Sequence, residues 1–137
     1  MKKGINILLV EDDKIEIMKL RRTISMLDLN HKVIEAKSAE EAFLFLENHN
    51  TIPDIILLDL NMPKTSGTEF LTALKENKDL NHIPTIILTT SNNPKDLKEC
   101  YRLGISGYIL KPLKYEHYVK KIELTLSYWS QNELINS

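Results

Sequence analysis

The sequence has little cysteine and little net charge. Cys100 is the only cysteine, and the formal net charge is -1 over 137 residues. A single cysteine excludes an intrachain disulfide and is typical of a reducing compartment. The balanced charge excludes bulk attraction to nucleic acid or to anionic lipid, and we find no basic run long enough to act as a local patch. We therefore expect neither nucleic acid nor a membrane as a partner.

Long hydrophobic runs are also missing. No segment approaches the roughly 20 apolar residues that span a bilayer. The amino terminus has neither the apolar core nor the small-residue cleavage site of a signal peptide. These absences predict a cytoplasmic protein. Repeats, linkers and low-complexity segments are absent too, and the length suits one domain, so we expect residues 1–137 to form a single domain.

Short apolar runs alternate with segments of helical periodicity along the whole chain. The five runs that suit strands are residues 5–10, 32–36, 54–63, 83–90 and 107–110. The alternation predicts an α/β fold, a (βα)5 doubly wound parallel five-stranded sheet with helices on both faces. Right-handed crossovers favour the flavodoxin-like order 2-1-3-4-5, although the pattern does not exclude neighbouring orders.

Several helix boundaries have their own signals. Two are capping boxes, in which a serine hydroxyl accepts the backbone N–H three residues later. One is an asparagine before a proline, which suits a helix start, and one is a glycine that ends a helix. These signals are Ser38 with Glu41, Ser66 with Glu69, Asn93 with Pro94, and Gly104.

The third apolar run contains a carboxylate that a buried strand does not need. Asp59 follows Ile55-Ile-Leu-Leu58 and precedes Leu60. A buried charge is costly unless it has a partner, and a cap or a turn does not explain its position. Asp59 either projects into a crevice at the carboxyl end of the strand, where open α/β sheets bind ligands, or has a buried partner.

Other polar residues end or follow the predicted strands at the same edge of the sheet. They are Glu11, Asp12 and Asp13 after the first strand, Thr89 at the fourth and Lys111 after the fifth. Each has an ordinary explanation when taken singly: a helix start for the acidic triplet, a strand residue for Thr89, a solvated lysine for Lys111. Clustered carboxylates repel unless a cation lies among them, and an all-oxygen site suits Mg²⁺. Their convergence predicts a magnesium site.

Such a site can accept a phosphoryl group. The Asp59 carboxylate would attack phosphorus, Thr89 would donate a hydrogen bond to a phosphoryl oxygen, and Lys111 with Mg²⁺ would neutralise the phosphoryl charge. The expected product is an aspartyl phosphate.

Four motifs together resemble the receiver domain of two-component response regulators, in order and in spacing. They are Leu8-Leu-Val-Glu-Asp-Asp13, Leu57-Leu-Asp-Leu-Asn-Met-Pro63, Leu88-Thr-Thr90 and Gly107-Tyr-Ile-Leu-Lys-Pro112. The resemblance implies a stand-alone, CheY-like receiver with no effector domain. Such a protein is a phosphorylation-dependent signalling switch that accepts its phosphoryl group from a sensor histidine kinase. It catalyses only its own phosphorylation and dephosphorylation, so we do not expect an enzyme in the usual sense.

The resemblance also implies a ligand set for Mg²⁺. Asp12 would be the direct ligand, Glu11 would act mainly through water, and Asn61 would contribute its backbone carbonyl. Asp59, the phosphoacceptor, would complete the metal set. The pair Glu11-Asp12 replaces the Asp-Asp that many family members have, a common variation.

The family further implies a switch and an output surface. Thr89 would be the switch hydroxyl, Tyr108 the aromatic switch residue and Lys111 the phosphate-binding lysine, and the bond between Lys111 and Pro112 would be cis. Phosphorylation would change the face made by the fourth helix, fifth strand and fifth helix. That face would bind a downstream protein or a phosphotransfer protein, or form a homodimer. Thr89-Thr-Ser-Asn-Asn93 and Ser127-Tyr-Trp129 resemble the small regulators paired with bacterial phytochromes and related hybrid kinases.

Three other functions stay open. The chain could be a phosphate-shuttle receiver in a phosphorelay, a Mg²⁺-dependent hydrolase with an aspartyl-phosphate intermediate, or a scaffold with an inactive site. Such hydrolases typically carry a second carboxylate two residues after the nucleophile, where this chain has Asn61. The intact set of site residues argues against the scaffold.

Overall fold

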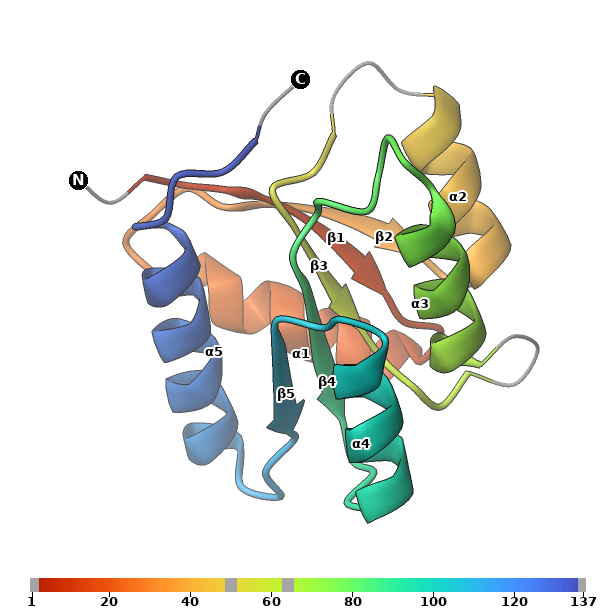
Figure 1. Ribbon diagram of the computed structural model, residues 1–137. Coiled ribbons are helices and arrows are strands. Elements are labelled where there is room, and N and C mark those ends of the chain that lie inside the picture. The colour runs from red at the N-terminus through yellow and green to blue at the C-terminus, as the bar shows by residue number, and fades with distance from the viewer. Residues whose placement is uncertain (1–2, 49–51, 63–65, 136–137) are drawn as a thin grey trace.

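The computed structural model describes residues 3–48, 52–62 and 66–135. The strands are β1 (Asn6–Val10), β2 (Lys32–Ala36), β3 (Ile55–Leu58), β4 (Thr85–Thr89) and β5 (Gly107–Leu110). The helices are α1 (Lys14–Ser25), α2 (Ala39–Asn48), α3 (Gly67–Glu76), α4 (Pro94–Arg102) and α5 (Tyr115–Trp129). All strand pairs are parallel and the order is β2-β1-β3-β4-β5, so the predicted fold class and strand order are confirmed (Figure 1).

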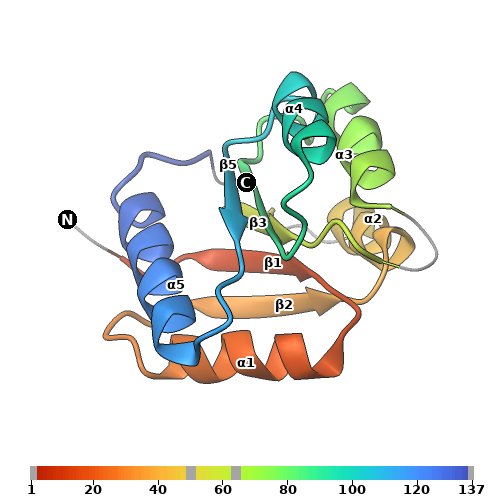
Figure 2. The same cartoon turned by 90° about the horizontal axis from the view of Figure 1, so that it is seen from below.

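Helices cover both faces of the sheet. Helices α1 and α5 lie on one face, and α2, α3 and α4 lie on the other (Figure 2). Because side chains alternate along a strand, each inner strand supplies both hydrophobic clusters. In β3, Ile56 and Leu58 point toward α3, whereas Ile55 and Leu57 point toward α1 and α5. All four are at most 1% exposed, which explains the unbroken apolar run in the sequence.

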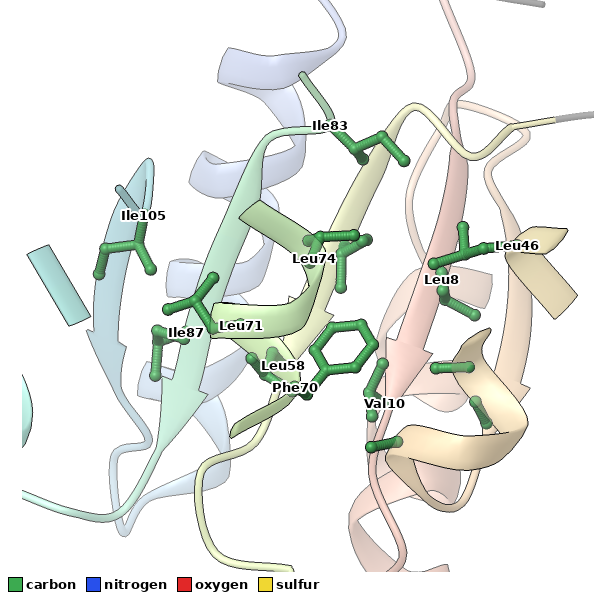
Figure 3. Close-up of a cluster of buried hydrophobic side chains, with 14 of the residues drawn as sticks. Leu8, Val10, Leu46, Leu58, Phe70, Leu71, Leu74, Ile83, Ile87 and Ile105 are labelled. Carbon is green, nitrogen blue, oxygen red and sulfur yellow. The ribbon is translucent and has the colours of Figure 1, made fainter. Parts of the chain in front are cut away.

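The cluster under α3 fixes the end of β3 in space. Phe70, Leu71 and Leu74 of α3 lie over Leu58 and Val10 of the sheet (Figure 3). Helix α3 begins against the backbone that follows Asp59: a Cβ on Gly67 would lie 2.8 Å from the Leu60 Cα and 2.9 Å from the Asp59 carbonyl oxygen. Only glycine permits this approach, so the segment carrying Asp59 is held between the sheet and α3.

The predicted helix boundaries are confirmed. The hydroxyls of Ser38 and Ser66 accept backbone N–H groups three residues later, at 3.1 and 3.2 Å. Asn93 caps α4 by accepting the Lys95 N–H at 2.9 Å. Gly104 has a φ of 96°, which an L side chain rarely adopts, and it follows the last turn of α4.

Within the described ranges, none of the helices is both long enough and apolar enough to cross a membrane.

Candidate functional site

Three carboxylates meet at the carboxyl ends of β1 and β3. Glu11, Asp12 and Asp59 each place a carboxylate oxygen within 4.8 Å of the other two. The adjacency of β1 and β3 causes this, and the Asp59 N–H continues the ladder by donating to the Val10 carbonyl at 3.1 Å. Glu11 is 3% exposed and Asp59 is 8% exposed. The predicted convergence of these three residues is therefore found.

Asp13 has a different task from its two neighbours. Its carboxylate caps α1 by accepting the N–H groups of Ile15 at 2.9 Å and Glu16 at 3.4 Å. The helix-start explanation is thus right for Asp13. The acidic triplet divides between the carboxylate cluster and the cap.

Lys111 reaches the cluster from the end of β5. Its Nζ lies 2.9 Å from Oε1 of Glu11 and 3.0 Å from Oε1 of Glu16, and its side chain is 7% exposed. Its backbone N–H donates to the Thr89 carbonyl at 2.8 Å. The solvated-lysine explanation is therefore wrong, because this ammonium is buried between two carboxylates.

Burial and charge act on the pKa values of this pair. Burial raises the pKa of Glu11 to about 7; the Asp59 charge adds to this, while the bond to Lys111 opposes it. Burial alone lowers the pKa of Lys111, but the hydrogen bond and charge of Glu11, with Asp59 and Glu16, outweigh it, so the pKa of Lys111 is raised. The raised pKa of Lys111 reflects the carboxylates around it, whereas the raised pKa of Glu11 reflects mainly its burial.

The donor set fits a hard divalent cation. Glu11, Asp12 and Asp59 offer only oxygen atoms, and the short distances among them are repulsive unless a cation lies between them.

The predicted cis bond before Pro112 is wrong. The described residues contain no cis peptide bond. The trans form of an X–Pro bond is intrinsically favoured by about 0.5–1 kcal/mol. With the trans bond, the Lys111 backbone stays paired to β4 and its side chain still reaches Glu11.

Thr89 ends β4 and is fully buried. Its Oγ accepts the Ser91 N–H at 3.2 Å, and the Asn61 side-chain amide lies 3.5 Å from it. Asn61 stands two residues after Asp59 and is exposed. The hydroxyl thus lies between the segment that follows β3 and the segment that follows β4. The metal-ligand role of the Asn61 carbonyl stays a prediction.

Tyr108 is half-buried on β5, and its hydroxyl donates to the Ser91 carbonyl at 2.9 Å. Burial raises the pKa of Tyr108, with a smaller opposing effect of its bond to Ser91. Ser91 in turn donates its side-chain hydroxyl to Asp96 of α4 at 2.5 Å. One residue, Ser91, therefore joins the two predicted switch residues to each other and to α4.

Sequence reasoning missed Glu16 and the linking role of Ser91. Glu16 lies in the first turn of α1, where an acidic residue is common because it favours the positive end of the helix dipole. That general preference gives no signal of a contact with Lys111, which is 95 positions away in the chain. For Ser91, only its position just after Thr89 could have pointed to the link.

Comparison with protein families finds a match to the model described as "Response regulator receiver domain" over residues 7–123. Among curated relatives, Response regulator Rcp1 of Synechocystis sp. is 34% identical over 128 residues, which cover 90% of this chain and 87% of the relative. The probable methanogenesis regulatory protein FilR2 of Methanothrix harundinacea is 32% identical over 127 residues, covering 90% of this chain and 82% of the relative.

Solved structures show the same similarity. The phosphorylated cyanobacterial phytochrome response regulator RcpA superposes with a TM-score of 0.89 and 30% identity, covering 96% of this chain and 98% of that one. The Mn²⁺-bound form of response regulator Rcp1 gives a TM-score of 0.87 and 32% identity, covering 96% and 99%.

Proposed function

This chain belongs to the response regulator receiver domain family, and from that premise we propose that Asp59 accepts the phosphoryl group of a two-component signalling switch. The observation that carries this proposal is the meeting of Glu11, Asp12, Asp59 and Lys111 at one edge of the sheet. A carboxylate beside a buried ammonium and a cation site has what phosphoryl transfer requires: a nucleophile and positive charge to stabilise the transferred group.

We propose Mg²⁺ as the ion, bound directly by Asp12 and Asp59, through water by Glu11, and by the Asn61 carbonyl. Mg²⁺ prefers oxygen ligands and keeps part of its hydration shell, which suits a cluster of few carboxylates. When bound, the ion supplies charge neutralisation for the phosphoryl oxygens. Response regulator Rcp1, to which this chain is similar, has been solved in a Mn²⁺-bound form, which supports binding of a divalent cation.

Each residue of the site would then have its own role in the reaction. An Asp59 oxygen forms the bond to phosphorus as the phosphorus–nitrogen bond of the kinase phosphohistidine breaks, and the electron pair stays on the histidine nitrogen. Lys111 neutralises a phosphoryl oxygen, and the Thr89 hydroxyl donates a hydrogen bond to another.

The hydrogen bonds of Ser91 suggest how the signal leaves the site. If the Thr89 hydroxyl turns toward a phosphoryl oxygen, it loses its hydrogen bond from the Ser91 N–H. Ser91 also accepts a hydrogen bond from Tyr108 through its carbonyl and donates one to Asp96 through its hydroxyl. The rearrangement would therefore reach β5 and α4 and bias the α4-β5-α5 face between two states.

Partners follow from this scheme. We propose a sensor histidine kinase as donor and a downstream protein, a phosphotransfer protein or a second copy of the chain as the binder of the α4-β5-α5 face, all in the cytoplasm. Exposed apolar side chains on that face support a protein partner: Leu97, Tyr101 and Leu110. The similarity to RcpA, a phytochrome response regulator, supports a phytochrome-type or related hybrid kinase.

The test is intact-mass spectrometry after incubation with Mg²⁺ and acetyl phosphate. We expect one added phosphoryl group on the wild type and none on Asp59→Asn. The matched control is Asp54→Asn, which changes the carboxylate at the other end of β3 and should still be phosphorylated. The proposal is contradicted if Asp59→Asn gains a phosphoryl group or if the wild type gains none. Steady turnover of a phosphate ester would instead favour the hydrolase.

A further inference from the structure

Glu16 is an acidic residue next to the site that the proposed reaction does not use. Its Oε1 is buried and lies 3.0 Å from the Lys111 Nζ. Glu16 Oε1 has no other hydrogen-bond partner among the described residues, so its contact with Lys111 is an ion pair. The ammonium of Lys111 is therefore what neutralises this buried oxygen, because a buried carboxylate oxygen without a counter-charge is costly.

The second oxygen of Glu16 faces another lysine. Its Oε2 lies 3.7 Å from the Lys19 Nζ, which is also 4.4 Å from the centre of the Tyr118 ring. The distance is longer than that to Lys111, and Lys19 is held partly by the aromatic ring. Lys19 can thus neutralise part of the Glu16 charge but does not replace Lys111 at Oε1.

The two carboxylates that contact Lys111 differ in whether they can also bind a cation. Glu11 belongs to the group that can bind a cation, whereas Glu16 does not. If the cluster held a cation, Glu11 would be shared between the cation and Lys111, whereas Glu16 would keep its contact with Lys111. A phosphoryl group on Asp59 would then have to compete with Glu16 for the ammonium.

We propose that Glu16 is a positioning residue that holds the Lys111 ammonium on the α1 side of the site before phosphorylation and so slows phosphorylation of Asp59. The proposal rests on the proposed function. Glu16 stabilises the unphosphorylated site more than the transition state, in which Lys111 faces the phosphoryl oxygens, and such ground-state stabilisation lowers the rate.

The same reasoning predicts an asymmetry between the two directions. In the phosphorylated protein Lys111 already lies on the phosphoryl group, both before and during hydrolysis. Glu16 then affects the start and the transition state of hydrolysis equally. Its removal should speed phosphorylation and leave the lifetime of the aspartyl phosphate unchanged.

The experiment compares wild type, Glu16→Gln, Glu16→Asp and Glu40→Gln at saturating Mg²⁺ and fixed acetyl phosphate, with intact mass followed over time. Glu40 is the matched control, since it is an exposed glutamate in the first turn of α2. We expect Glu16→Gln to be phosphorylated about two- to fivefold faster, the size expected for loss of one partly exposed ion pair. Glu16→Asp, which keeps the charge, should lie nearer the wild type, and Glu40→Gln should match it.

The half-life of the aspartyl phosphate, measured after acetyl phosphate is removed, distinguishes a positioning role of Glu16 from a general loosening of the fold. Equal half-lives for wild type and Glu16→Gln support the proposal, whereas phosphorylation and hydrolysis rates that change together overturn it. A wild type that is phosphorylated at the same rate as Glu16→Gln also overturns it, and leaves the proposed function standing. A wild type that is not phosphorylated overturns both.

Discussion

Asp54 and Asp59 stand at the two ends of β3, with only the four strand residues between them, and they are 7% and 8% exposed. At the amino end, an Asp54 oxygen accepts the Asn6 N–H at 2.7 Å, and the Asp54 N–H donates to the Asn6 carbonyl at 2.8 Å. At the carboxyl end, Asp59 faces Glu11 and Asp12. An aspartate thus accepts a backbone hydrogen bond at one end of β3, and an aspartate lies among other carboxylates at the other end.

The neighbours of each aspartate repeat this difference. At the amino edge, the buried His31 uses Nδ1 to accept the Ile5 N–H at 3.1 Å, so a second side chain completes the start of β1. At the carboxyl edge, one ammonium faces the carboxylates of Glu11 and Glu16. At the amino edge the polar side chains are paired with backbone groups, whereas at the carboxyl edge three carboxylates lie close together, as expected if that edge binds the proposed cation.

Removing the metal should have the largest effect, because it should abolish phosphorylation at the carboxyl edge and leave the amino edge unchanged. In EDTA we expect phosphorylation by acetyl phosphate to fall by about 100-fold or more, because the charge that stabilises the transferred group is lost. The fold should persist, since its two hydrophobic clusters need no metal. Intact mass and far-ultraviolet circular dichroism on one sample measure both. Unfolding in EDTA would mean that the carboxyl edge is structural after all.

The two edges should respond to pH in opposite directions. The pKa of Glu11 is raised by burial from 4.5 to about 7 in the folded protein, so its contribution to stability is fully present below pH 4.5 and is lost as the pH rises through about 7. Burial lowers the pKa of His31 from 6.5, so its contribution is present above pH 6.5 and is lost as the pH falls below that value.

Thermal unfolding in EDTA across pH 5 to 8 (roughly the range that these two groups cover) tests this. Glu11→Gln should remove the loss of Tm toward high pH, and His31→Gln should reduce the loss toward low pH while keeping an acceptor for Ile5. Adding Mg²⁺ should raise the Tm of the wild type more at high pH than at low pH. A Glu11→Gln profile parallel to the wild type would contradict the assignment.

Truncating Asp54 tests the structural edge. Asp54→Ala leaves the Asn6 N–H without its side-chain acceptor, and we expect a loss of about 1–3 kcal/mol in the free energy of unfolding. Urea denaturation measures the loss, and the phosphorylation rate of the folded protein should stay within about twofold because ΔΔG at a distant site does not couple to the chemistry. A stability equal to the wild type would show that water replaces the carboxylate.

Truncating Asp59 should have the smallest effect on stability and the opposite sign. Asp59→Ala removes a charge that repels Glu11 and Asp12, so we expect the metal-free protein to gain about 1 kcal/mol. Urea denaturation in EDTA measures the gain, and Mg²⁺ should reduce it because the wild type then recovers. A loss of stability in EDTA would mean that Asp59 holds a structural contact.

Local patterns in the chain predicted most of the fold. The apolar runs, the capping serines, Asn93 and Gly104 are all read over a few residues, and each one corresponds to a boundary in the structure. Asp59 was also visible locally, as a charge on an apolar strand. What failed was a detail inferred from family likeness, the cis bond before Pro112, because nothing in the short motif there outweighs the intrinsic preference for trans.

The sequence alone determined the five apolar runs, their alternation with helices and the edge at which Glu11, Asp12, Asp59, Thr89 and Lys111 would meet, since these follow from periodicity and strand direction. Only the tertiary structure decided how the charges pair. It gave Asp13 to the helix cap and Lys111 to Glu11 and Glu16, and it joined Thr89 to Tyr108 through Ser91. The reason is that an ion pair depends on distances of a few ångströms between residues far apart in the chain, which packing sets and no local pattern encodes.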